Sequence, residues 1–102
     1  MEDGAPELAE VLDQWRRSAD ELGECLQVSG ATVTNWLRSG VPAERRRQVA
    51  DLWRATVALA GRAGPGGVAA AVRRRDTHLG GFSLLEVART GDTSLVARHT
   101  VT

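Results

Sequence analysis

The side chains best suited to chemistry in this sequence lie along residues 30–38, where short or polar groups alternate with apolar ones at helical spacing. Such a face is suited to hydrogen bonding rather than bond making, because a helix with small and polar groups on one side can enter the major groove of DNA. The outer face of the predicted helix carries Ala31, Thr32, Thr34, Asn35 and Arg38.

We expect Thr34, Asn35 and Arg38 to face base edges, with Ser29, Ala31 and Thr32 at the start of the helix. Three arginines follow shortly afterwards and open the next predicted helix, where they could hold phosphates. A solvated charged face is the alternative for this run. The predicted phosphate contacts are Arg45, Arg46 and Arg47.

Residues 18–40 have the pattern that positions such a helix, namely two short helices joined by a tight turn. Ser18 and Glu21 form an S-x-x-E capping box at the start of the first helix. Gly23 is small enough for the second helix to pack closely, and Gln27 occupies the left-handed turn position at a cost of order 1 kcal/mol. Other positions fit the motif as well: Leu22 and Leu26 on the first helix, Val28 in the turn, Ser29 as second cap, Val33, Trp36 and Leu37 on an inner face, and Gly40 with Pro42 at the end.

Further helical patterns flank this helix-turn-helix and predict an all-α protein, a small helical bundle followed by short C-terminal helices. Residues 1–5 are predicted to be disordered, and an amphipathic helix is predicted over 6–17. A fourth helix should start at Pro42 and run to Leu59 or Ala60. Its predicted buried stripe is Val49, Leu52, Trp53, Thr56 and Val57, and Trp15, Trp36 and Trp53 are expected to meet in one core.

Glycines divide the second part of the chain. Residues 61–67 predict a Gly/Pro-rich turn or linker between a helix-turn-helix bundle over 1–60 and a small helical region over 68–102. Within that region we expect a helix from Val68 to Arg75, a break at Gly80 and Gly81, and two short helices. Ser83 with Glu86 would cap the first of these, Gly91 would end it, and Asp92 would cap the second, with Leu95 and Val96 on its apolar side.

Charge is unevenly distributed along a chain whose formal net charge is zero. Residues 1–24 hold eight acidic side chains and two arginines, a local charge of −6, whereas residues 25–75 hold nine arginines and two acids, a local charge of +7. The basic block contains the predicted recognition helix, where a phosphate-contacting surface would be expected.

Catalytic, metal and cofactor sites are not indicated, so we expect a protein that is not an enzyme. Cys25 is the single cysteine and falls beside apolar positions, which suits a small buried residue. His78 and His99 are too far from it in sequence to suggest a zinc site, and no Lys-Ser/Thr follows the glycines at 64–67. The acidic N-terminus does not resemble a secretory signal, and no apolar run approaches a membrane span. These features predict a cytoplasmic protein.

The tail GGFSLLEVARTGDTSLVARHT resembles the C-terminal signature of the Xre/MbcA/ParS antitoxin family. The matching residues are Ser83, Leu85, Glu86, Val87, Ala88, Thr90, Gly91, Asp92, Leu95 and Val96, while Leu84 stands where the family usually has proline. The resemblance implies a helix-turn-helix followed by a small toxin-binding domain, and a RES-domain toxin that consumes NAD⁺ as partner. The partner-binding residues that it implies are Leu85, Arg89, Gly91, Asp92, Arg98 and His99.

The sequence therefore predicts an antitoxin-like autorepressor that binds a double-stranded DNA operator as a homodimer, since one recognition helix covers only a few base pairs. Two alternatives stay open. One is a free-standing repressor from a phage or mobile element, without a toxin. The other is a protein-interaction adaptor that uses a helix-turn-helix scaffold without DNA.

Overall fold

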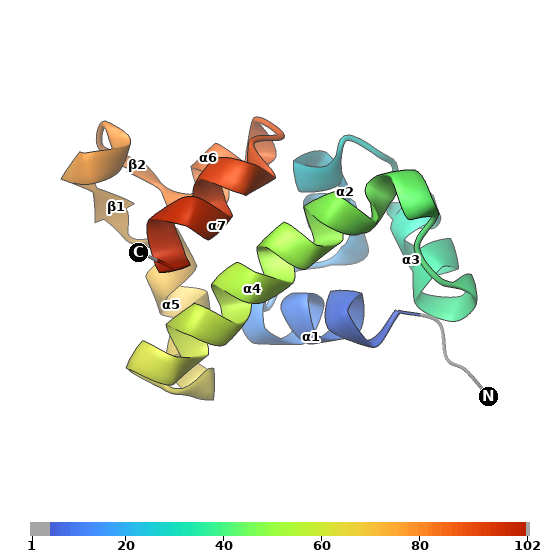
Figure 1. The fold of residues 1–102 in the computed structure, drawn as a ribbon, viewed down its shortest axis with the longest axis horizontal. Helices are drawn as coiled ribbons and strands as arrows, with labels where there is room; N and C mark the ends of the chain where they lie inside the picture. The colour runs from blue at the N-terminus through green and yellow to red at the C-terminus, as the bar shows by residue number, and fades with distance from the viewer. Residues whose placement is uncertain (1–4, 102) are drawn as a thin grey trace.

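The computed structural model describes residues 5–101, apart from the side chains of Pro65 and Val101, and it is all-α except for one two-stranded hairpin (Figure 1). Residues 1–5 were predicted to be disordered. Residues 1–4 lie outside the described residues, whereas Ala5 is buried at the start of the first helix. Along the chain the α-helices are α1 (Pro6–Trp15), α2 (Ala19–Leu26), α3 (Gly30–Ser39), α4 (Arg46–Ala63), α5 (Val68–Arg73), α6 (Leu84–Arg89) and α7 (Thr93–Val101). Short 3-10 turns are η1 (Ala43–Arg45), η2 (Pro65–Gly67) and η3 (Thr77–Leu79).

Helix α4 is the longest element and joins the two ends of a molecule that measures 40 × 25 × 21 Å. It contacts α1 and α7 along its length, and Figure 1 shows α3 at one end of the molecule and the hairpin at the other. Apolar side chains from all seven described α-helices form a single buried cluster. The C-terminal helices therefore pack on the helix-turn-helix part rather than standing apart from it.

The fourth helix departs from its predicted form in three ways. It begins with η1 before the α-helix starts at Arg46, and it continues to Ala63, so that the predicted linker shrinks to a turn at 64–67. The prediction that Val57 is buried was wrong, because its side chain is 50% exposed and Ala55 and Leu59 are buried instead. Trp53 is half-buried at the edge of the core, whereas Trp15 and Trp36 are buried.

A small hairpin replaces the end of the helix predicted to reach Arg75. Strands β1 (Arg75–Asp76) and β2 (Phe82–Ser83) pair antiparallel, with Arg75 opposite Ser83 and Asp76 opposite Phe82. Gly80 and Gly81 both have positive φ and close the loop between them. None of the helices within residues 5–101 is long and apolar enough to cross a membrane.

Candidate nucleic-acid interface

The α2–α3 pair has the helix-turn-helix arrangement that the sequence predicts. The Ser18 hydroxyl accepts a hydrogen bond from the Glu21 N–H, and the Glu21 carboxylate accepts one from the Ser18 N–H, which completes the capping box. Gln27 has φ of 61° and occupies the left-handed turn position. Ser29 caps α3 by accepting from the Thr32 N–H. Local side-chain chemistry therefore fixes both helix starts and the turn between them.

Two glycines allow the helices to approach each other closely. A Cβ at Gly23 would lie 2.6 Å from the Val28 carbonyl oxygen, so the turn packs directly on the backbone of α2. Gly30, the first residue of α3, sits against Asp20, whose Cα would be 3.0 Å from an added Cβ. The close approach at Gly23 was predicted from the sequence, but the one at Gly30 was not, because contact between residues ten positions apart depends on the crossing of the two helices.

Helix α3 turns one face into the core and leaves the other open. Val33 and Trp36 are buried, and Ala31, Thr34, Asn35 and Arg38 are exposed. The placement of these four residues agrees with the predicted outer face, whereas Thr32, also predicted to lie on it, is only partly exposed. Helix α3 lies at one end of the molecule (Figure 1). A partner as large as a DNA duplex could therefore approach it.

The polar side chains of this face differ in whether they already form hydrogen bonds within the protein. The Thr34 hydroxyl donates to the Gly30 carbonyl oxygen, and the Ser29 and Thr32 hydroxyls share a hydrogen bond of 2.9 Å at the helix start. Among the described contacts, none occupies the Asn35 amide or the Arg38 guanidinium. These two exposed side chains are the best suited to hydrogen-bond base edges.

The three arginines predicted to hold phosphates are not equivalent. Arg45 is half-buried and donates from Nη1 to the Leu26 carbonyl oxygen at 2.9 Å and to the Gln48 amide oxygen at 3.1 Å. It thereby ties the start of α4 to the end of α2, so we assign it a positioning role. Arg46 and Arg47 are exposed, and Arg46 uses only its Nε, 3.3 Å from the Val41 carbonyl oxygen. Arg46 and Arg47 therefore remain the candidates for phosphate contact.

The residues that the family resemblance implies for partner binding are spread over different environments. Leu85 is buried in the core, which corrects its assignment to a partner surface, because its side chain is unavailable while the domain is folded. Asp92 caps α7 by accepting from the Leu95 N–H at 3.1 Å. His99 is half-buried, with Nε2 2.9 Å from an Asp76 carboxylate oxygen. Arg98 is exposed on α7, where its Nε donates to the Ser94 carbonyl oxygen.

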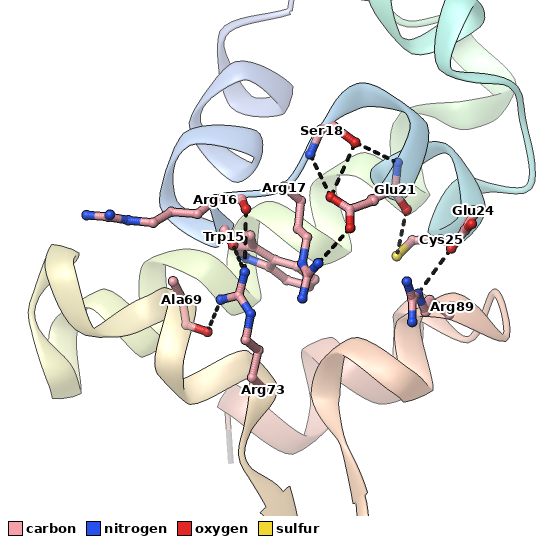
Figure 2. Close-up of polar contacts among 10 residues, drawn as sticks. All are labelled: Trp15, Arg16, Arg17, Ser18, Glu21, Glu24, Cys25, Ala69, Arg73 and Arg89. Atoms are coloured by element: carbon pink, nitrogen blue, oxygen red, sulfur yellow. Dashed lines mark hydrogen bonds and ion pairs between the residues drawn. The ribbon is translucent and has the colours of Figure 1, made fainter.

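The remaining two of these residues contact the helix-turn-helix itself. Arg89 places Nε 3.1 Å from a Glu24 carboxylate oxygen on α2 (Figure 2). Gly91 has φ of 92°, and a Cβ there would lie 3.4 Å from the Gln27 amide nitrogen. The loop between α6 and α7 is therefore in contact with the turn between α2 and α3.

Arg73 makes a second connection between the two parts of the chain. Its Nη2 lies 3.2 Å from the Trp15 carbonyl oxygen and 3.4 Å from that of Arg16, at the end of α1, and its Nη1 donates to the Ala69 carbonyl oxygen (Figure 2). A guanidinium is well suited to this position, because a helix C-terminus carries carbonyl groups without intrahelical partners. The Arg73 side chain therefore binds the protein's own backbone.

Hydrogen bonding and burial account for the pKa shifts of the titratable groups near the interface. A hydrogen bond from the Ser18 N–H, followed by one from the Arg17 side chain, lowers the pKa of Glu21. Burial raises the pKa of the Cys25 thiol to about 11, as expected of a cysteine that packs in the core. Within residues 5–101 no three His, Cys, Asp or Glu side chains are grouped so that they could hold a metal ion.

Comparison with known proteins gives no match to any family model, to any curated protein or to any solved structure. The inference about function therefore depends on the geometry of α3 and its surroundings, and on the sequence resemblance described above.

Proposed function

We propose that this protein is a transcriptional regulator that binds a double-stranded DNA operator as a homodimer in the cytoplasm, and that it is not an enzyme. The observation that carries the proposal is the exposed face of α3, on which Asn35 and Arg38 point away from a helix whose other side is buried. Arg46 and Arg47, at the start of α4, would hold phosphates beside the groove. Arg45 and the two helix caps would keep α3 in position.

Replacing both Asn35 and Arg38 with alanine tests this proposal. Each good contact to a base edge contributes about 1–3 kcal/mol, so we expect the double variant to bind the DNA upstream of its own gene at least about a hundredfold more weakly. The thermal melt should hardly move, because both side chains are exposed. The matched control is Arg74→Ala, which removes an exposed arginine outside α3. Wild-type affinity in the double variant would refute the assignment of α3 to the groove.

The salt dependence of binding separates this function from an adaptor that uses the scaffold without DNA. Several phosphate contacts release several counterions, so the logarithm of the affinity should fall steeply with the logarithm of salt concentration. Arg47→Gln should reduce that slope by roughly one unit while leaving the preference for the operator unchanged. A flat response to salt, or no binding to the upstream DNA, would favour the adaptor.

As a second function we propose capture of a RES-type toxin by the C-terminal helices, which would make the repressor an antitoxin. The specific observation in its favour is that Arg89, Asp92 and Arg98, from the segment with the family resemblance, are exposed. Co-purification with the product of a neighbouring RES-type gene would support it. An isolated gene would favour a free-standing repressor.

A further inference from the structure

Helix α4 has an outer face that no other part of residues 5–101 covers, and a stripe of apolar and small residues runs along it beside exposed arginines such as Arg54. Val57 lies in its middle and is 50% exposed; together with Phe82 it makes up the exposed large hydrophobic side chains of the described chain. Trp53 lies one turn before Val57 and is only half-buried, and Gly61 lies one turn after it and is exposed. Residues four apart share a helix face, so these three form one stripe.

The stripe is complementary to itself. If two α4 helices cross antiparallel with a two-fold axis at Val57, the residue four positions before Val57 faces the residue four positions after it. Trp53 of each copy would then lie against Gly61 of the other. A Cβ at Gly61 would have no atom within 4 Å, so the molecule itself gives no steric reason for a glycine there. Glycine inside a helix costs about 1 kcal/mol relative to alanine, and a bulky ring packing against it would account for the missing side chain.

A surface hollow of about 440 Å³ lies beside Trp53 and extends the apolar area. Val41, Val49 and Ala50 contribute to its wall, and Glu7, Arg46 and Arg54 also line it. The chain as a whole has zero formal net charge, so no net long-range repulsion opposes the approach of two copies.

The length of α4 is comparable to the width of a standard interface. A standard interface buries about 800 Å² on each partner, which corresponds to a patch about 30 Å across. The 18 residues of α4 extend about 27 Å at 1.5 Å per residue.

We propose that a second copy of this chain covers the outer face of α4, with the two-fold axis at Val57 and Trp53 packed over the partner's Gly61. From Val57 back to Arg46 the helix rises roughly 16 Å, so the two α4 N-termini would lie roughly 33 Å apart. One turn of B-DNA is about 34–36 Å, the usual separation of half-sites. This spacing argument rests on the proposed operator binding, but the pairing through α4 does not.

A disulfide at the two-fold axis tests the pairing without DNA. We expect oxidised Val57→Cys to form a covalent dimer, because residues on a two-fold axis between packed helices approach within disulfide reach. Phe82→Cys is the matched control and should stay monomeric in a non-reducing gel, since Phe82 is 55% exposed on the hairpin. Cys25 is buried and will not compete. Absence of the Val57→Cys dimer, or equal cross-linking of Phe82→Cys, would overturn the proposal.

Sedimentation equilibrium gives the second measurement. Wild type should have twice the 10.9 kDa mass of one chain, and Val57→Glu and Gly61→Leu should each weaken the dimer at least about tenfold, while Phe82→Glu leaves it within about twofold. The space at Gly61 and the exposure of Val57 should let both variants fold, with unchanged far-UV circular dichroism. A monomeric wild type, or a dimer that withstands both changes, would refute pairing through α4 and leave the binding of α3 to DNA to be judged by its own test.

Discussion

The Trp15 side chain shows how one buried hydrogen bond joins distant parts of this fold. Its Nε1–H donates to the Thr56 hydroxyl at 2.8 Å, and Thr56 donates in turn to the Leu52 carbonyl oxygen. Both side chains are almost completely buried. The indole N–H therefore has no access to water if the hydroxyl is lost.

We expect Thr56→Val to lower the free energy of unfolding by about 2 kcal/mol, because it leaves the buried Trp15 N–H unpaired. Thr100→Val is the matched control: Thr100 is equally buried, but its hydroxyl only donates to carbonyl oxygens of its own helix. That variant should change stability by less than about 0.5 kcal/mol. Urea denaturation measures both, and equal losses would show that the Trp15 bond contributes little.

Glu86 provides a test of pH dependence at the scale of one residue. Folding lowers the pKa of Glu86 below its ordinary value of 4.5, first because its carboxylate accepts a hydrogen bond from the Ser83 N–H, and also because of the nearby charge of Arg75. The unfolded chain therefore binds more protons at low pH than the folded one. The resulting stabilisation is full above the unfolded value and is lost as pH falls through the lowered folded value.

Glu86→Gln should remove the pH-dependent part of the stabilisation, while its side-chain amide oxygen remains as the acceptor of the capping box. We expect the wild type to be more stable than the variant at neutral pH, with the difference shrinking steadily below pH 4.5. Thermal melts over a pH series measure it. A difference that is constant across pH, or that grows in acid, would show that the carboxylate charge has no part in the cap.

At the scale of the elements, the close packing of the α2–α3 turn depends on Gly23. Gly23→Ala would bring its Cβ within 2.6 Å of the Val28 carbonyl oxygen, a backbone atom that cannot move without shifting the turn. We expect a loss of roughly 2 kcal/mol in stability together with weaker operator binding. Gly66→Ala is the control, because an added Cβ there has no atom within 4 Å and its φ is not in the left-handed region. Equal stability of the two variants in urea would argue against tight packing at the turn.

The elements that the sequence predicts well are those fixed by local chemistry. The two capping boxes, the Ser29 and Asp92 caps, and the left-handed Gln27 were all confirmed, because each depends on residues a few positions apart. The hairpin was missed because β1 and β2 have two residues each, too short for an alternating pattern to be visible. Val57 on α4 was wrongly predicted to be buried, since apolar spacing alone cannot distinguish a core position from one on an uncovered face of the helix.

The candidate site shows the same division between local and distant interactions. The exposure of Asn35 and Arg38 follows from helical periodicity, and the structure agrees with it. The interaction of Arg45 with the Leu26 carbonyl oxygen could not be anticipated, because the residues are 19 positions apart and meet only when η1 comes close to the end of α2 in the folded chain. Leu85 was assigned to a partner surface by resemblance alone, and its burial depends on how α6 docks.

At the scale of the whole molecule, the N-terminal and C-terminal parts share one core. Val68, Val72 and Val96 belong to the same buried cluster as Leu8 and Trp15. Polar contacts cross between the parts as well, from Arg73 to the end of α1, from Arg89 to Glu24, and from the Arg62 side chain to the Thr100 carbonyl oxygen. Separating the two parts would expose side chains of this shared core to water, so we expect the chain to unfold as one cooperative unit.

Val96→Ala tests whether the chain unfolds as one unit, because Val96 is fully buried on α7 whereas the tryptophans all lie at or before position 53. The cavity should cost on the order of 2 kcal/mol. If the molecule unfolds as one unit, the tryptophan fluorescence transition in urea will move to lower concentration by the same amount as the far-UV circular dichroism transition. Phe82→Ala, at an exposed position on the hairpin, should move neither. A fluorescence transition that stays at its wild-type midpoint would mean that the helix-turn-helix part is stable without α7, and the contacts of Arg73 and Arg89 would then join two independently folding units.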